Sequence, residues 1–246
     1  MRLGRSITRL HLLVTAAVAV LALGLPGSAA NASAVGVTSP GVYLGGPNEC
    51  EGIFPDVPTG YPFCQYIEHM HHIGVAQGFS DGTFRPTSVL RRQEFAAFLY
   101  RYVQHHRGIE FIPPTAPTFS DVPPSHPFFE AIEWAASAGI MEGFEGAFRP
   151  GAPMLRQDLA RAMYHFAVWD QYRGAESFMP PSGPTFLDVP ASHFLYKEIE
   201  WNAAANVMLG FVDGRFRPRV EARRQEAMAV LARYYNPVGV PADKVA

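Results

Sequence analysis

A threefold internal repeat constrains this chain more than any other feature of its sequence. Segments 54–79, 119–144 and 186–211 align without gaps, and the second and third share 14 of 26 residues. Each segment leads into the same turn, Gly-x-Phe-Arg-Pro, at 82–86, 146–150 and 214–218. Similarity of this kind indicates internal duplication, so the fold has to be built from three copies of one supersecondary unit.

Each copy predicts two amphipathic helices around that turn. In the first half of the second copy, Phe128, Ile132, Ala135 and Ile140 recur at helical spacing. After the turn, apolar residues keep the helical period in all three copies, for example Phe95, Leu99 and Tyr102, then Leu159, Met163 and Phe166, then Ala227, Leu231 and Tyr234. A single helix pair cannot bury both apolar faces, so we expect an all-α fold in which three helix-turn-helix units pack on one another.

The repeats occupy 54–107, 119–172 and 186–235, and a linker at 35–53 precedes them. The connectors between them, 108–118 and 174–184, each contain two adjacent prolines. Proline blocks helix formation and favours extended chain, so the connectors are either semi-rigid spacers or ordinary surface loops.

The amino terminus has the pattern of a secretory signal peptide over residues 1–34. Three arginines precede an uncharged stretch from Leu12 to Leu25, and small residues with Ala-x-Ala sites follow it. A membrane anchor is the competing interpretation, but the apolar run is shorter than the roughly 20 residues that a spanning helix needs. We therefore expect a secreted protein with no membrane segment after cleavage.

The charge balance argues against nucleic acid as a partner. Removal of Arg2, Arg5 and Arg9 with the signal peptide changes the formal net charge from −2 to −5. Long-range attraction depends on the summed charge, so any anionic ligand must be bound by local clusters of arginine.

Cys50 and Cys64 are the only cysteines, and the predicted compartment is oxidising. This context predicts a disulfide between them. A metal site is the alternative, but the nearby His69, His71 and His72 fit no standard zinc spacing, so we assign no metal and no cofactor.

Motifs of catalysis are missing from the sequence. It contains no serine nucleophile motif, glycine-rich phosphate loop or His-Glu-x-x-His run. Paired carboxylates could serve a glycosidase, but their separation cannot be seen in a sequence. We expect a protein that is not an enzyme, with a cell-wall hydrolase as the least favoured alternative.

The order of motifs in each copy resembles the S-layer homology (SLH) repeat. The shared features are Phe-x-Asp-Val-Pro, a helix with Ile-Glu-Trp in two copies, Gly-Phe, Gly-x-Phe-Arg-Pro, and an Arg-x-acid sequence that opens the second helix. The resemblance implies a three-pronged helical module with pseudo-threefold symmetry on a bacterial cell surface. Modules of this family bind a secondary cell-wall polysaccharide, often one with pyruvyl ketals, in grooves between the prongs.

The resemblance also implies which residues bind the polymer. The arginine of the family's Thr-Arg-Ala-Glu signature is retained as Arg92, Arg156 and Arg224, and the acid as Glu94, Asp158 and Glu226. A guanidinium forms two parallel hydrogen bonds with a carboxylate such as that of a ketal-linked pyruvate. The signature threonine is absent from all three copies, which removes the hydroxyl half of a capping box. We expect the helices to persist and leave open whether the ligand is the family's usual sugar.

Trp134 and Trp201 occupy one position in the second and third copies, where the first has His69. An amphipathic ring suits an exposed sugar groove, so both tryptophans are candidate polysaccharide-binding residues. Tryptophan beside an apolar helix face is more often buried in the core.

Two interpretations compete with sugar binding by the arginines. The arginines could instead form salt bridges with Glu68, Glu133 and Glu200, which recur at one position of the first helix. The whole chain could then be a structural or adaptor protein of the envelope whose sugar sites are degenerate. We expect either a stand-alone wall protein or a module whose prongs recruit a protein partner.

Overall fold

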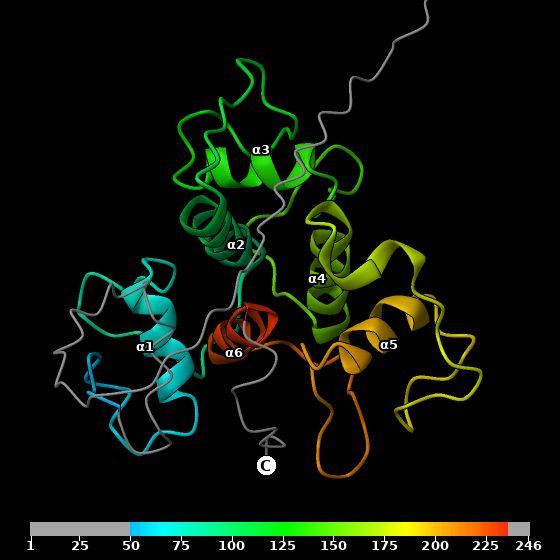
Figure 1. Ribbon diagram of the computed structural model, residues 1–246. Coiled ribbons are helices and arrows are strands. Elements are labelled where there is room, and N and C mark those ends of the chain that lie inside the picture. Colours follow the sequence, from blue (N-terminus) through cyan, green and yellow to red (C-terminus); the bar gives the residue numbers. More distant parts are fainter. Residues whose placement is uncertain (1–49, 236–246) are drawn as a thin grey trace, which may run out of the picture. The chain divides into compact units, whose positions relative to one another are not determined.

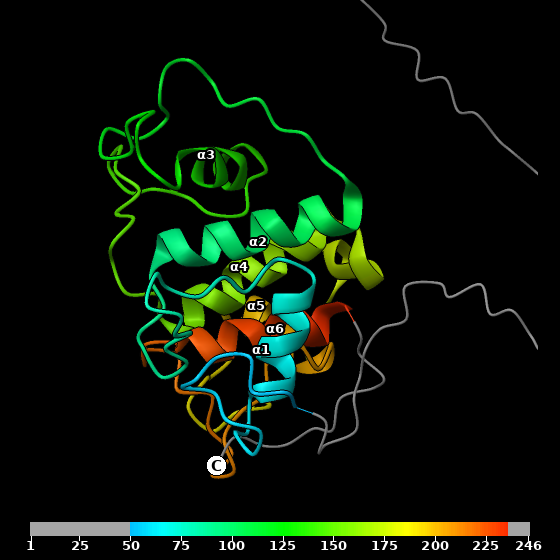
Figure 2. The same cartoon turned by 90° about the vertical axis from the view of Figure 1, so that its left-hand side faces the viewer.

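The computed structural model describes residues 50–235, and the fold is all-α, as predicted (Figures 1 and 2). Each repeat supplies one short helix of nine residues and one longer helix. In chain order the elements are α1 (Cys64–His72), α2 (Arg92–Arg107), α3 (Phe129–Ser137), α4 (Arg156–Trp169), the 3₁₀ helix η1 (Tyr172–Ser177), α5 (Tyr196–Ala204) and α6 (Arg224–Tyr235). The predicted signal peptide lies outside the described residues.

The two helices of a repeat do not form the main helix pairs of the fold. The short helix α3 packs on α2 of the preceding repeat, α5 packs on α4, and α1 packs on α6 at the other end of the chain. Figure 1 shows these pairs as three units around the long helices α2, α4 and α6. Because the first repeat closes against the third, the three copies form a ring, and each depends on its neighbours for its core.

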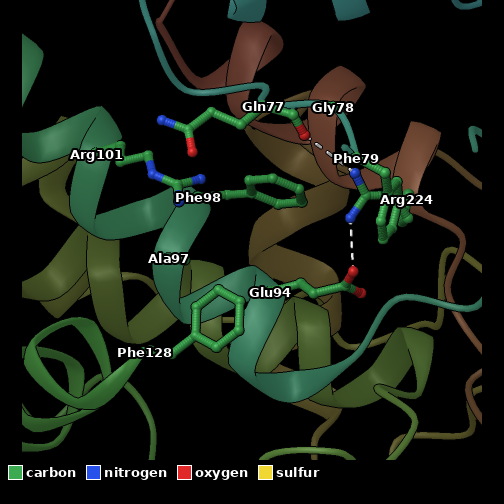
Figure 3. A pocket seen from close by; sticks show the side chains of 9 residues that line it. All are labelled: Gln77, Gly78, Phe79, Glu94, Ala97, Phe98, Arg101, Phe128 and Arg224. Atoms are coloured by element: carbon green, nitrogen blue, oxygen red, sulfur yellow. Dashed lines mark hydrogen bonds and ion pairs between the residues drawn. The ribbon is translucent and has the colours of Figure 1, made fainter. Parts of the chain in front are cut away.

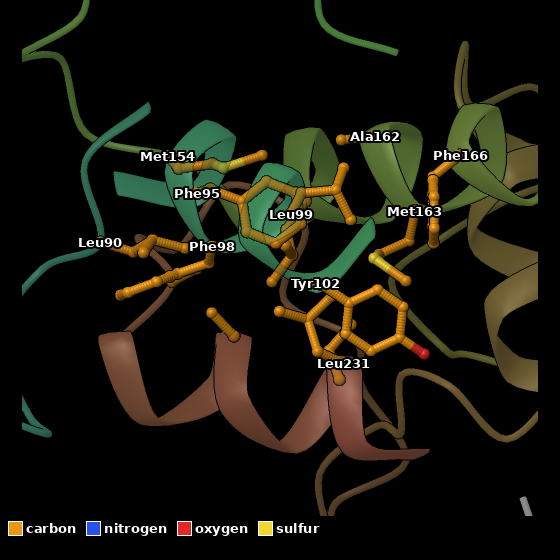
Figure 4. Close-up of a cluster of buried hydrophobic side chains, with 14 of the residues drawn as sticks. Leu90, Phe95, Phe98, Leu99, Tyr102, Met154, Ala162, Met163, Phe166 and Leu231 are labelled. Carbon is orange, nitrogen blue, oxygen red and sulfur yellow. The ribbon is translucent and has the colours of Figure 1, made fainter. Parts of the chain in front are cut away.

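Apolar residues of the three long helices form layers along the centre of this ring (Figure 4). The third, seventh and tenth residues after the initial arginine of each long helix are buried in all three copies. These positions hold Phe95, Leu159 and Ala227, then Leu99, Met163 and Leu231, then Tyr102, Phe166 and Tyr234. Side chains of unequal size share each layer, so the three repeats fill the core by complementary volumes rather than by identical residues.

A closed set of backbone hydrogen bonds joins the segments that lead into the long helices. The Leu90 N–H donates to the Ala222 carbonyl at 2.9 Å, Ala222 donates to Met154 at 2.8 Å, and Met154 donates to Leu90 at 2.9 Å. All three side chains are fully or almost fully buried. Every repeat therefore satisfies a buried polar group of the next one, which fixes the register of the ring.

The repeated Phe-x-Asp-Val-Pro segment holds the Gly-x-Phe-Arg-Pro turn of its own repeat. The two carboxylate oxygens of Asp121 accept the N–H groups of Phe148 and Arg149 at 2.8 and 2.7 Å. Asp56 and Asp188 make the same pair of bonds in the other repeats. The backbone of the turn arginine is in the left-handed region in each copy, with φ between 57° and 59°. This conformation is unusual for residues other than glycine. The aspartate stabilises it by accepting both amides.

The predicted disulfide between Cys50 and Cys64 is confirmed, with 6.1 Å between the Cα atoms. It attaches the segment before the first Phe-x-Asp-Val-Pro motif to the start of α1. None of the helices in the described range has the length and apolar character that a bilayer crossing requires.

Gly143 offers a test of how tightly the turn is packed. A Cβ at this position would collide with the ring of Phe119 and lie 2.7 Å from the carbonyl oxygen of Ala147. We expect Gly143→Ala to lower the free energy of unfolding by about 1–3 kcal/mol, because a well-packed site cannot absorb the added methyl group. Gly151→Ala is the matched control, since a Cβ there meets nothing within 4 Å. Denaturant unfolding of both variants checks this, and equal stabilities would contradict it.

Candidate functional site

The three predicted site arginines occupy the first position of the three long helices and reach into the next repeat around the ring. Their Nε atoms each donate to the carbonyl of the phenylalanine in that repeat's Gly-x-Phe-Arg-Pro turn. Arg92 donates to Phe148 at 2.9 Å, Arg156 donates to Phe216 at 2.8 Å, and Arg224 donates to Phe84 at 3.0 Å. Each guanidinium also lies over the ring of the same phenylalanine, at 4.6 to 4.8 Å from its centroid.

A second contact of each arginine holds the loop that follows the short helix. The Nη2 atom of Arg92 donates to the carbonyl of Glu142 at 2.7 Å, and Arg156 donates likewise to Leu209 at 3.0 Å. Arg224 makes the longer equivalent contact to Gln77 at 3.4 Å. Each arginine thus fixes two loops of the adjacent repeat, and the arginine of the third repeat closes the set on the first.

Two of the arginines also form buried ion pairs with the acid at the start of the next long helix. Arg224 donates from Nη1 to Oε1 of Glu94 at 2.6 Å, and Arg156 pairs in the same way with Glu226. The second carboxylate oxygen of each glutamate accepts the backbone N–H of the residue before its helix, Arg91 at 2.8 Å and Arg223 at 2.7 Å. The glutamate half of the capping box therefore survives the loss of threonine.

The prediction that Glu68, Glu133 and Glu200 form salt bridges with the site arginines is wrong, because these glutamates accept hydrogen bonds from other groups. Glu133 accepts the N–H and the hydroxyl of Thr118 at 2.8 and 2.6 Å, and Glu200 accepts the same groups of Thr185. Glu68 accepts the amides of Glu51, Gly52 and Ile53. These glutamates hold the chain that enters each Phe-x-Asp-Val-Pro segment.

The groove at Arg92 departs from this pattern, because its acid is the shorter Asp158. Within the part of the chain that the structure describes, Arg92 has no ion pair, and its Nη1 atom makes no hydrogen bond. Arg92 is half-buried, whereas Arg156 and Arg224 are 4% and 3% exposed. Burial raises the pKa of the Asp158 carboxyl. Because Asp158 forms no ion pair with Arg92, part of the Arg92 guanidinium is left open.

Arg161 adds a second cation to the Arg92 groove. It lies on α4 one turn after Asp158 and pairs with the exposed Glu142 at 2.6 Å. Together Arg92, Asp158 and Arg161 line a small groove of about 50 Å³. Burial is the main cause that lowers the pKa of Arg92; the neighbouring Asp158 opposes this shift, and Arg149 and Arg161 add to it.

A larger groove of about 190 Å³ lies at Arg224 (Figure 3). The Arg224–Glu94 ion pair forms part of its wall, and Arg101 lies across Phe98 from this pair, next to the side chain of Gln77. Phe98 and Phe128 contribute apolar surface. This groove offers aromatic contacts and the half-buried Arg101, but its buried Arg224 is already paired with Glu94.

The first two backbone N–H groups of each long helix are not free to bind a ligand. The amides of Arg92 and Gln93 donate to the carbonyls of Ala152 and Pro150 at 3.1 and 3.0 Å. The equivalent amides of α4 and α6 donate to the next repeats in the same way. An anion in these grooves must therefore be bound by side chains.

Trp134 and Trp201 are both 3% exposed and belong to the core. Trp134 lies against Tyr100 and Trp169, and Trp201 lies against Tyr164 and Tyr172. Neither ring offers a face to a groove, so we do not retain them as sugar-binding residues.

Sequence reasoning missed Arg101 and Arg161 as groove residues. Arg161 is not repeated, because the equivalent positions hold Ala97 and Ala229. A search for residues common to the copies passes over such a position. The signal that could have revealed Arg161 is a difference between the copies: a charged residue stands where the other two copies have alanine.

Comparison with known proteins identifies the repeats. Residues 53–96, 118–160 and 185–228 match the model of the S-layer homology domain. Cell surface glycoprotein 1 of Acetivibrio thermocellus is 27% identical over 168 residues, 66% of this chain and 7% of that protein. The Cellulosome-anchoring protein of the same organism is 24% identical over 66% of the chain and 35% of its own length.

An Amylopullulanase of Thermoanaerobacterium thermosulfurigenes is 28% identical over 67% of the chain. The match covers 8% of that protein. The chain therefore spans a minor part of each of these three relatives.

Replacement of the arginines tests how differently they are held. We expect Arg224→Ala to lower the free energy of unfolding by about 3–5 kcal/mol, because it leaves a buried carboxylate without its partner. Arg92→Ala removes hydrogen bonds but no ion pair, so we expect a loss of about 1–3 kcal/mol. Urea titration of the two variants measures the difference. A loss at Arg92 as large as that at Arg224 would show that Arg92 is paired as tightly.

Proposed function

This chain belongs to the S-layer homology family, and we propose that it is a non-catalytic module that binds an anionic secondary cell-wall polysaccharide. Binding is non-covalent and takes place in the grooves between the repeats. A pyruvyl ketal is the group on such a polymer that best suits an arginine, since it presents a carboxylate for bidentate hydrogen bonding. The protein acts outside the cell, at the bacterial surface.

The comparisons support the cell-surface part of this proposal. Two relatives carry the names Cell surface glycoprotein 1 and Cellulosome-anchoring protein, and both match across the repeats. The enzymatic name of the Amylopullulanase belongs to a protein of which the match covers 8%, so it gives no reason to assign hydrolysis here.

The open guanidinium of Arg92 is the observation that carries the binding mechanism. One of its terminal nitrogens is left without a bond in the described part of the chain, while the ion pairs of Arg156 and Arg224 occupy the same nitrogen. Arg161 supplies a second charge-assisted donor on the adjacent helix. The two guanidinium groups share the groove with Asp158 and with Glu142, the exposed partner of Arg161, so it is the unbonded nitrogen of Arg92 rather than an excess of charge that favours a carboxylate ligand here.

Arg156 and Arg224 have a positioning role in the same proposal. Their ion pairs with Glu226 and Glu94 hold the neighbouring repeats and thereby set the width of the grooves. Arg224 lines the larger groove, where Arg101 and two phenylalanines provide further contacts. Sugar binding there depends more on the aromatic surface than on the buried charge.

The second candidate is an adaptor function with degenerate sugar sites. The burial and pairing of two of the three arginines favour it, because those side chains are not available to a ligand in this conformation. In that case the exposed prongs would recruit a protein cargo or an envelope partner.

Cosedimentation with purified cell-wall sacculi tests the proposal. We expect the mature protein to sediment with intact sacculi and to remain in solution once their secondary polymers are stripped. Arg92→Ala/Arg161→Ala should weaken binding at least about tenfold, because two charge-assisted contacts are lost. Arg215→Ala is the control, an exposed arginine of a turn. Failure of the folded parent to sediment would favour the adaptor function.

A pair of reciprocal substitutions tests whether the length of the acid controls the groove. Asp158→Glu adds the methylene group that lets Glu226 reach Arg156 in the equivalent place. We expect it to raise the thermal midpoint and to weaken binding to sacculi about tenfold, because the new ion pair occupies Arg92. Glu94→Asp should remove the ion pair with Arg224, and we expect it to lower the thermal midpoint without weakening binding to sacculi. If Asp158→Glu binds as the parent does, Arg92 is not the ligand contact.

A further inference from the structure

A cavity larger than either groove lies away from them, where the carboxyl ends of the long helices meet. Its volume is about 320 Å³, the lower end of the range for ligand pockets, which begins at about 300 Å³. The site arginines begin these helices, whereas the cavity is lined by residues of their last turns and of the segment after α4, among them Tyr102, His106, Phe166, Asp170, Tyr234 and Tyr235.

An aromatic wall covers the inner side of this cavity. Tyr102, Phe166 and Tyr234 are the tenth residues after the first arginine of their helices and form the last apolar layer of the core. Their ring centroids are 4.9 to 6.3 Å apart. Figure 4 shows Tyr102 and Phe166 at the end of the labelled core away from Leu90. Tyr172 extends the wall, with its ring 4.2 Å from that of Tyr234.

The outer side of the cavity combines a ring face with hydrogen-bonding groups. Tyr235 is 42% exposed and stacks on His106 with 4.2 Å between the centroids. The Nε2 atom of His106 is buried and has no hydrogen-bond partner among the described residues. Such an atom in a native protein calls for a partner, and the cavity provides room for one.

The charges at the cavity compensate each other. Asp170 pairs with Arg107 through one carboxylate oxygen and accepts the Tyr234 hydroxyl at 2.9 Å through the other. Burial, with the neighbouring His105, His69 and Arg107, lowers the pKa of His106 to about 4, so this imidazole is neutral at pH 7. Arg107 would repel a cation, and the Asp170 carboxylate that could attract it is already paired. Asp170 would likewise repel an anion. The cavity therefore favours a neutral ligand.

We propose that this cavity binds a neutral sugar ring. The apolar face of such a ring packs on tyrosine, while its hydroxyl groups can bond to the free nitrogen of His106, to the phenolic groups and to Arg107. The site is distinct in place and in chemistry from the arginine grooves, and it does not rest on the function proposed for them. A neutral unit of the wall polymer and an amino sugar of peptidoglycan share this chemistry.

Heteronuclear NMR titration of the full mature chain tests the proposal with defined sugars. The probes are methyl glucoside, N-acetylglucosamine and its β-1,4-linked dimer. We expect saturable shifts of the Tyr102, Tyr235 and His106 signals with at least one probe at millimolar concentration. Preference for methyl glucoside would indicate a neutral hexose unit, and preference for the acetylated dimer would indicate peptidoglycan.

Variants separate this site from the grooves. Tyr235→Ala removes an exposed ring, and we expect it to weaken sugar binding at least tenfold while the thermal midpoint changes little. Arg92→Ala/Arg161→Ala should leave the same titration unchanged, even where its binding to sacculi is lost. Absence of saturable shifts with every probe would overturn the proposal. Shifts that persist in Tyr235→Ala and vanish in the double variant would also overturn it.

Discussion

The contact of one arginine with the next repeat is the interaction on which the rest of the structure depends. Each long helix begins with a guanidinium that binds two loop carbonyls of the adjacent copy, and in two copies it also pairs with that copy's helix-capping glutamate. Short helices pack across the same boundaries, and the amides of Leu90, Met154 and Ala222 close a ring of hydrogen bonds. Three pairs of helices that would be marginal alone therefore share one core and one polar network.

The same interaction explains why the three grooves differ although the repeats are similar. A glutamate spans the distance to the guanidinium and also accepts the amide that precedes its helix, whereas Asp158 has one methylene group fewer. The ion pair is lost, the aspartate is left in a partly desolvated place where its pKa rises, and Arg92 keeps a free donor for a ligand. In the proposed mechanism, the loss of one methylene group exchanges a stabilising contact for a ligand contact, which fits the general trade between stability and function. At the carboxyl ends of the long helices the charges are balanced instead, because Arg107 and Asp170 form an ion pair beside the aromatic layer.

Sequence reasoning predicted the repeats, the helices and the disulfide because these depend on periodicity, turn residues and compartment. It did not predict that α1 packs on α6, because an apolar stripe shows that a helix has a partner but not which one. Trp134 and Trp201 were candidates for a sugar site, yet an indole beside an apolar face is buried in both copies. The partner acids were also assigned to the wrong position: Glu133 and Glu200 recur as regularly as Glu94 and Glu226, and only the geometry shows which of them reaches an arginine. Arg161 escaped notice because it breaks the repeat pattern.

The central claim is that Arg92 is available to a carboxylate ligand while Arg156 and Arg224 are held by their glutamates. Arginine guanidinium N–H signals in NMR spectra of the mature protein, above all those of the Nη1 groups, report on this once single arginine-to-lysine variants have assigned them. Addition of a pyruvylated monosaccharide should shift the Arg92 signal in a saturable manner and leave those of Arg156 and Arg224 in place. Shifts of Arg224 or Arg156 without a shift of Arg92 would contradict the claim, and so would the absence of any saturable change.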